Sequence, residues 1–289
     1  MSIVLSNGHE IKYVVASGAL GFDGKGWLWE RPLVWLGLIK PELFTVVIKT
    51  LTLNKTKGNL RWWKPWTCVR LIASGSVNKI GLTNKGIEWW CKKVGPKIDF
   101  NKVSLVGSIY GDKKQLLEMA DLLNKFDFVA LEINDSCPNT GHALQQAQTI
   151  IENVKAVTRI SRHPIILKVS CTQDYLTIAT GLTGIAEAIS INSVPFEKVF
   201  PSKRSPLWKL EKKVGGGGGG VSGKPAQKFN WKVVEDLVKQ NLIPVIAPSI
   251  MDAGDLENVK KLGADAFSFG AIHLKTPWKP TTIVKREKN

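Results

Sequence analysis

The sequence lacks the features that would place it in a membrane or in a secreted compartment. Its 289 residues contain no apolar run of about 18 residues or more, so we expect no membrane-spanning helix. The N-terminus has neither the basic start nor the apolar core of a signal peptide. We therefore expect a cytoplasmic protein.

Cysteine and histidine are both scarce, with four of each in the chain. No two cysteines have C-x-x-C spacing and no histidine lies near one, so no metal site is expected. A disulfide framework is not expected in so long a chain with so few cysteines. We interpret the four as reduced thiols, which leaves room for one reactive cysteine. They are Cys68, Cys91, Cys137 and Cys171.

The composition is that of a globular protein, with 44% hydrophobic and 22% charged residues. The formal net charge is +16, which favours contact with polyanions or phosphorylated ligands. The lysines are scattered along the chain. We therefore favour a basic enzyme over a dedicated nucleic-acid-binding protein.

Eight short apolar runs alternate with helix-length segments. The runs are 14–18, 44–49, 103–108, 128–134, 165–169, 188–192, 243–247 and 266–270, and such runs are typical of parallel strands covered on both faces. Amphipathic segments lie at 113–125, 143–160, 175–182, 231–240 and 253–262. The alternation predicts an α/β fold, and eight strands predict a (β/α)8 TIM barrel formed by one domain, 1–289.

Polar or reactive residues recur at the C-terminal ends of five of these strands. They are Ser17, Lys49, Asn134 with Cys137, Lys168, and Asn192 with Ser193. In a parallel barrel, this end of the strands carries the active site.

Three segments depart from the alternation. Residues 61–84 hold three tryptophans and a turn-like stretch, which predicts a hairpin excursion over the barrel mouth. Residues 195–223 contain six consecutive glycines at 215–220, typical of a mobile linker or of a lid or phosphate-approaching loop at the C-terminal face. Residues 27–39 are rich in tryptophan and leucine. We interpret them as the first barrel helix packed on the sheet, with a partner or membrane contact as the alternative.

Seven sequence blocks, in order and with matching spacing, resemble the dihydroorotate dehydrogenase family. LEINDSCPN at 131–139 resembles its catalytic loop, and SVNKIGLTNKG at 76–86 its substrate loop. The other blocks are VIKTLTLNKTKGNL at 47–60, LKV at 167–169, INS at 191–193, GGVSG at 219–223 and residues 244–274. The resemblance implies a soluble, class 1-like, FMN-dependent enzyme of pyrimidine biosynthesis and a homodimer. GGVSG resembles the form that works with an iron–sulfur/FAD subunit.

The resemblance also implies roles for individual residues. Cys137 would take the C5 proton of dihydroorotate while a hydride passes from C6 to N5 of FMN, and Lys49 would favour the thiolate and the reduced flavin. The implied substrate contacts are Lys49, Asn78, Gly81, Leu82, Asn134, Asn139, Asn192 and Ser193, in which planar amides suit a pyrimidine. The implied FMN contacts are Ser17, Lys49, Thr50, Asn134, Lys168, Ile191, Gly223, Ser249, Gly270 and Ala271.

Two positions depart from the family pattern at its phosphate site. Pro248-Ser249 stands where the family usually has Gly-Gly, and Gly270-Ala271 where it usually has Gly-Thr. Proline has no backbone N–H, whereas the Ser249 hydroxyl supplies a donor. We expect FMN to bind less tightly or with a shifted phosphate.

Two other functions stay open at this point. A dihydrouridine synthase-like, tRNA-modifying flavoenzyme would suit the charge and the tryptophans, although the chain has no room for a separate RNA-binding domain. A non-catalytic barrel that has lost FMN would suit Pro248. The electron acceptor is also open: fumarate, NAD through a partner, or another oxidant.

Overall fold

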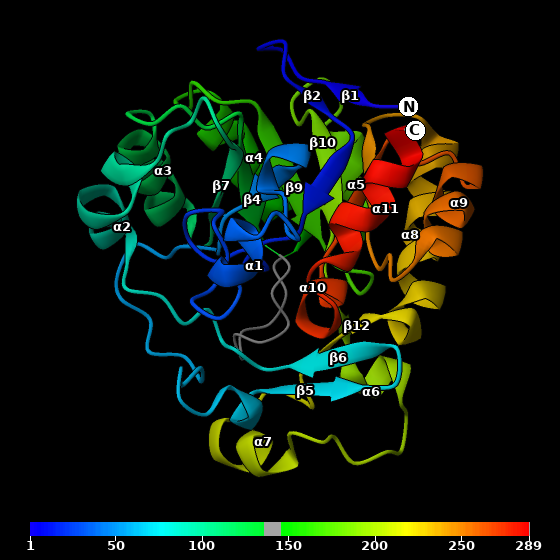
Figure 1. Cartoon of the computed structure of the whole chain (residues 1–289). Coiled ribbons are helices and arrows are strands. Elements are labelled where there is room, and N and C mark those ends of the chain that lie inside the picture. The colour runs from blue at the N-terminus through cyan, green and yellow to red at the C-terminus, as the bar shows by residue number, and fades with distance from the viewer. Residues whose placement is uncertain (136–145, 289) are drawn as a thin grey trace.

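A closed barrel of eight parallel strands forms the centre of the computed structural model, which describes residues 1–135 and 146–288. The strands are β3 (Tyr13–Val15), β4 (Thr45–Val47), β7 (Ser104–Ile109), β8 (Ala130–Asn134), β9 (Ile165–Val169), β10 (Ala188–Ile191), β13 (Val245–Ala247) and β14 (Ala266–Phe269). Each overlaps one of the eight predicted runs, so the predicted TIM barrel is confirmed (Figure 1).

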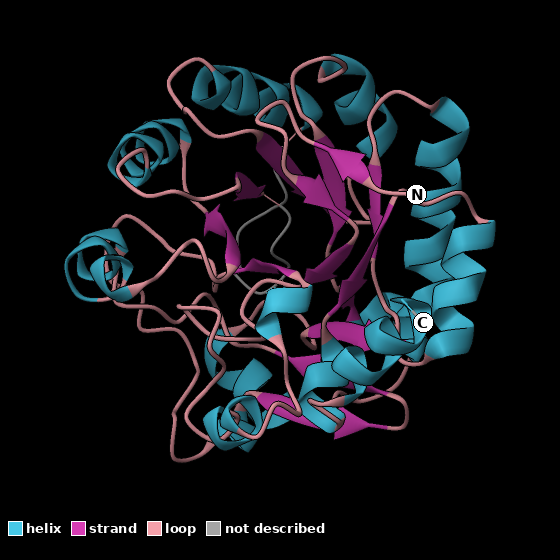
Figure 2. Ribbon diagram, turned by 45° about the horizontal axis from the view of Figure 1, so that its top comes forward, coloured by secondary structure: helices cyan, strands magenta, loops and turns pink. Residues whose placement is uncertain are grey.

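Helices surround the barrel (Figure 2). The five predicted segments correspond to α3 (Lys113–Leu123), α4 (Ala147–Thr158), α5 (Tyr175–Gly181), α8 (Lys224–Gln240) and α9 (Ala253–Lys261). Helix α8 begins earlier than predicted because Pro225 lies in its first turn, where proline suits a helix start. Further helices are α2 (Ile87–Lys93), α10 (Ala271–Lys275) and α11 (Lys279–Lys288), and there are 3-10 turns at η1 (Pro41–Leu43), η2 (Pro65–Thr67) and η3 (Gly95–Lys97). No described helix is long and apolar enough to cross a membrane.

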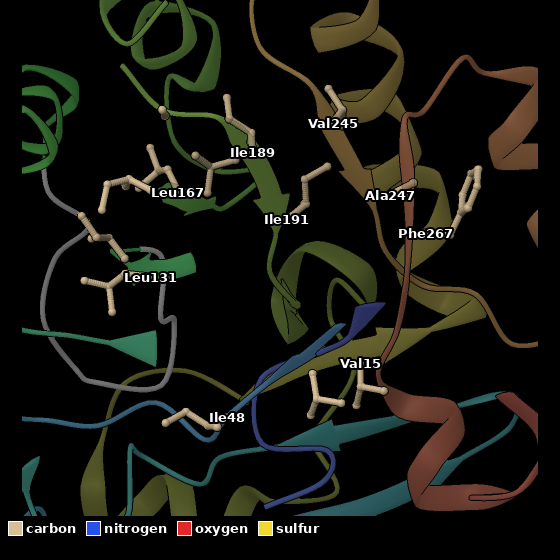
Figure 3. Close-up of a cluster of buried hydrophobic side chains, with 14 of the residues drawn as sticks. Val15, Ile48, Leu131, Leu167, Ile189, Ile191, Val245, Ala247 and Phe267 are labelled. Carbon is tan, nitrogen blue, oxygen red and sulfur yellow. The ribbon is translucent and has the colours of Figure 1, made fainter. Parts of the chain in front are cut away.

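Alternate residues of the barrel strands face two separate hydrophobic cores. Val15, Leu167 and Ile189 belong to the larger core, together with residues of the surrounding helices; Figure 3 shows part of this cluster. Residues one position away, such as Val14, Ile166 and Ala188, form a smaller core with Ile3, Leu5 and Ile11. The last three come from the hairpin of β1 (Ile3–Val4) and β2 (Glu10–Ile11) and the turn within it, at the barrel end opposite the β5–β6 hairpin (Figure 1).

A second, antiparallel sheet has the strand order β11-β12-β6-β5. It joins the hairpin of β5 (Val69–Ile72) and β6 (Gly75–Asn78) to β12 (Gly220–Gly223) and β11 (Val194–Pro195). The predicted hairpin at 61–84 is therefore confirmed. It lies beside α10 and below the barrel in Figure 1.

Residues 195–223 include α6 (Phe196–Val199), α7 (Trp208–Val214) and β12. Residues 215–219 of the glycine run form the loop that joins α7 to β12, as predicted, and specific contacts hold its backbone. The buried Lys79 ammonium donates to the carbonyl oxygens of Gly216 (2.7 Å) and Gly217, and Ser205 Oγ donates to that of Gly218 (2.7 Å). A Cβ at Gly218 would lie 2.8 Å from the Phe196 ring. Glycine is therefore required by close packing here.

The interpretation of residues 27–39 as a helix packed on the sheet is wrong. Helix α1 (Arg31–Trp35) has five residues, none of them buried. Trp35 is 81% exposed and Leu28 75%. Leu33 and Val34 pack only partly against the core. The apolar side chains of this segment therefore lie largely on the protein surface.

Candidate functional site

A pocket opens at the C-terminal ends of the barrel strands, under the second sheet. Every predicted site residue that the structure describes lines it. They are Ser17, Lys49, Thr50, Asn78, Gly81, Leu82, Asn134, Lys168, Ile191, Asn192, Ser193, Gly223, Ser249, Gly270 and Ala271. The other two, Cys137 and Asn139, lie outside the described residues.

The strand register divides the barrel interior into an apolar layer and a polar layer. Val47, Ile166 and Ala188 belong to the apolar layer. Since side chains two residues apart point to the same side of a strand, the next inward positions are Lys49, Lys168 and Ser190. These three side chains are buried and line the pocket. The chain thus places two lysines where the barrel interior meets the mouth.

Glu132 is the centre of the polar layer, and the sequence reasoning missed it as a site residue. Its Oε1 accepts from Lys168 Nζ and from Ser108 Oγ, both at 3.0 Å, and its Oε2 accepts from Ser190 Oγ at 3.1 Å. Ser108 is the Cα neighbour of Glu132 across β7 and β8. The signal that would have found Glu132 is its spacing of two from Asn134 in the same strand.

Asn134 and Ser17 are joined through Thr50. Asn134 Nδ2 donates to Thr50 Oγ1 at 3.0 Å, and Ser17 Oγ lies 3.0 Å from the same atom. Thr50 Oγ1 is also 2.9 Å from Ser108 Oγ, which links these residues to Glu132. The amide of Asn134 therefore has a fixed orientation at the pocket wall.

The second sheet brings the predicted substrate loop to the pocket. Gly81 and Leu82 both have positive φ, 65° and 52°. Leucine rarely adopts this conformation, and Asn84 Nδ2 supports it by donating to the Leu82 carbonyl oxygen at 2.6 Å. Asn78 Nδ2 donates to the carbonyl oxygen of Gly220 at 3.4 Å, across the β6–β12 pair.

The described cysteines are poor bases. Burial raises the pKa of the Cys68 thiol to about 11, despite the opposing charges of Lys49 and Arg61. Burial also raises the pKa of Cys91 and of Cys171. All three are free thiols. None of them lines the pocket.

The donor set suits a flavin mononucleotide. Lys49 and Lys168 bring positive charge to the pocket interior, where a reduced flavin holds negative charge. Gly18 packs beside the Lys49 stem and has a φ of 79°, a conformation that favours glycine. Asn230 Oδ1 is buried at the Ser249 corner with no hydrogen-bond partner among the described residues. The residues present therefore fit this cofactor.

These features define an α/β-barrel enzyme with a cationic ligand pocket at the C-terminal face of its sheet. The chain belongs to the dihydroorotate dehydrogenase family, because the model of that family matches residues 18–286. The enzymes of this family are oxidoreductases that use FMN. The family match favours this assignment over the dihydrouridine synthase alternative.

Curated relatives support the same family. The chain is 29% identical over 279 residues to the dihydroorotate dehydrogenase B (NAD(+)) catalytic subunit of Desulforudis audaxviator, covering 91% of this chain and 83% of that protein. It is 28% identical over 257 residues to the subunit of the same name from Brachyspira hyodysenteriae, covering 84% and 80%. A ligand-free dihydroorotate dehydrogenase structure from Eimeria tenella has the same fold, with a TM-score of 0.74, 18% identity and coverage of 99% and 86%.

Proposed function

We propose that this chain oxidises dihydroorotate to orotate with bound FMN, by a class 1-like mechanism in which Cys137 is the base. The observation that carries the proposal is the convergence of Lys49, Lys168 and the amides of Asn78, Asn134 and Asn192 on one pocket. Planar amides match the alternating donors and acceptors of a pyrimidine ring. The lysines match a ligand that becomes more negative during the reaction.

In this mechanism the residues of the chain bind, orient and move a proton. The proposed ligands of the orotate ring and its carboxylate are Lys49, Asn78, Gly81, Leu82, Asn134, Asn139, Asn192 and Ser193. The Cys137 thiolate removes the C5 proton, and bound FMN would supply the acceptor for the hydride from C6. Lys168 stabilises the negative charge that then develops in the pocket, while Glu132 fixes the position of the Lys168 ammonium.

The base role of Cys137 is supported by elimination as well as by its motif. The three described cysteines have raised pKa values and lie outside the pocket. Cys137 lies three residues after Asn134 in the chain. Asn134 ends β8 at the pocket wall.

The proposed protein partners are inferred from the relatives and not from the geometry of the pocket. The relatives named above are catalytic subunits of an NAD(+)-dependent type. We propose that this chain, as one FMN domain over 1–289, forms a homodimer in the cytoplasm. Its electrons would leave through an iron–sulfur/FAD subunit to NAD.

Anaerobic reduction of bound FMN by dihydroorotate tests the proposal. The purified protein loaded with FMN should lose its oxidised-flavin absorption when dihydroorotate is added. Cys137→Ala should retain FMN but lose this bleaching, and Cys171→Ala is the matched control that should bleach normally. Bleaching by Cys137→Ala at the wild-type rate would remove Cys137 from the base role.

The same measurement addresses the non-catalytic alternative, which Pro248 motivates. A protein that takes up no FMN would have lost the cofactor, and the scaffold function would replace the proposal. A protein that binds FMN but does not bleach would retain the cofactor and act on another substrate.

A further inference from the structure

At the corner of the pocket after β13, two backbone positions offer no donor to an anion. Pro248 has no N–H. The N–H of Met251 is already taken, because it donates to Asp255 Oδ2 at 2.9 Å. Asp252 occupies the N-terminus of α9, where its Oδ1 accepts from the N–H of Asp255 at 2.9 Å. A side-chain donor at this corner would therefore add to what the remaining backbone N–H groups offer a phosphate.

Helix α8 holds the backbone of this corner through three side chains on one face. Gln227 Nε2 donates to the carbonyl oxygen of Ser249 at 2.9 Å, and Trp231 Nε1 donates to that of Pro248 at 3.1 Å. Asn230 Nδ2 donates to Ser249 Oγ at 3.1 Å. Residues three and four apart share a helix face, so the spacing 227, 230 and 231 makes this support possible.

Ser249 is held in a conformation that serine rarely adopts. Its φ is 69°, which costs on the order of 1 kcal/mol or more for a residue with a Cβ. Glycine would adopt it without this cost. The retained hydroxyl is therefore the feature that distinguishes serine from glycine at this position.

The hydrogen bond from Asn230 determines what the Ser249 hydroxyl can do. A serine hydroxyl has one proton to donate and two lone pairs. The Asn230 amide occupies a lone pair, so the proton stays available for a second partner. Asn230 is 1% exposed, its Oδ1 has no partner among the described residues, and both side chains line the pocket.

We infer that Ser249 and Asn230 form a substitute anchor for the phosphate of FMN. Ser249 donates its hydroxyl proton to a phosphate oxygen. Asn230 is a positioning residue that holds the hydroxyl oxygen and leaves its proton free for the phosphate. The inference rests on the FMN dependence in the proposed function, and it depends neither on Cys137 nor on dihydroorotate as substrate.

Comparison of FMN with riboflavin, which lacks the phosphate, tests the anchor. Dissociation constants for both flavins are measured by flavin fluorescence on the full chain. Ser249→Ala should weaken FMN binding about tenfold, as for loss of a hydrogen bond to a charged group, and leave riboflavin binding unchanged. Ser249→Gly should give the same loss although it relieves the backbone strain, which separates the hydroxyl from the conformation.

Asn230→Ala tests the positioning role. It should weaken FMN binding by a smaller factor, about threefold, and should have no further effect once Ser249 is alanine. Asn258→Ala, on the adjacent helix α9, is the matched control and should change neither flavin.

Three results would overturn the anchor. In the first, both Ser249 variants keep the wild-type preference for FMN over riboflavin. In the second, the variants lose affinity for FMN and for riboflavin by the same factor. In the third, the wild-type protein binds FMN no more tightly than riboflavin. A different result would reject the proposed substrate and keep the anchor. In that case the Ser249 variants lose the preference for FMN as expected, but dihydroorotate does not reduce the FMN bound to the wild-type protein.

Discussion

The ammonium of Lys168 lies 3.0 Å from Glu132 Oε1, and both side chains are buried at the floor of the pocket. A buried pair of this kind is costly to break, because either partner alone leaves an uncompensated charge. Because both residues line the pocket, the charges of this pair act directly on a ligand bound there.

We predict that this pair sets the reduction potential of bound FMN. Glu132→Gln removes a negative charge and should raise the potential by tens of millivolts, because reduced flavin is the more negative form. Lys168→Gln should lower it. Redox titration of the two loaded variants measures the shifts, and shifts of the same sign in both would contradict the electrostatic explanation.

Substitution of Asn78 and of Asn84 should distinguish a side chain that binds the substrate from one that supports the substrate loop. Asn78→Ala should weaken orotate binding about tenfold, because the side chain lines the pocket. Asn84→Ala should lower both orotate affinity and stability, because it supports Leu82 in a strained conformation. Equilibrium titration and urea unfolding of the two variants provide the comparison.

Replacement of Lys79 by methionine should increase the backbone motion of the glycine run, residues 215–220. Lys79 is 2% exposed and donates to the carbonyl oxygens of Gly216 and Gly217. Loss of these charge-assisted bonds should lower the free energy of unfolding by about 2 kcal/mol. Hydrogen exchange should rise at 215–220, while exchange in the barrel strands stays unchanged. Unchanged exchange in the glycine run would show that packing alone holds it.

His273 should make the protein less stable in acid. Burial lowers its pKa to about 4, and neither ring nitrogen has a hydrogen-bond partner among the described residues. Between pH 6.5 and 4 the unfolded chain binds a proton that the native protein does not. Stability therefore falls as the pH falls through this window, by up to about 3 kcal/mol. In urea unfolding, His273→Phe should flatten this part of the profile.

Glu30 should have the opposite pH dependence. Burial raises its pKa to about 7, against the lowering effect of its hydrogen bond from the Trp27 N–H. The native protein holds this proton above the usual carboxyl range, so its contribution to stability is lost as the pH rises from 4.5 through 7. Glu30→Gln should therefore be more stable than the wild type at pH 8, relative to pH 5. A variant with the same slope as the wild type would exclude Glu30 as the cause.

The sequence predicted the barrel because its strands are buried on both faces. Runs such as 165–169 carry their signal within five residues, and that strand has the predicted bounds. Lys168 stood out for the same reason, as a charge within an apolar run. Local signals of this kind do not depend on the rest of the fold.

The parts that the sequence did not predict depend on contacts between distant segments. Lys79 lies 137 residues from Gly216, so the glycine run has no local sign of its support. Asn230 reaches Ser249 from the preceding helix. Segment 27–39 has the composition of a buried helix, but α1 is too short to present a continuous face to the sheet.

Strand β5 belongs to the sheet that covers the pocket, and it also affects how the protein can self-associate. The barrel is closed and has no edges, whereas β5 pairs only with β6 among the described strands and leaves one row of peptide groups without a strand neighbour. Such an edge is a template for self-association. Arg70 is exposed on β5, and Pro65 lies in the turn just before it. A charged side chain on the strand and a proline next to it are features that oppose pairing of this edge with another chain.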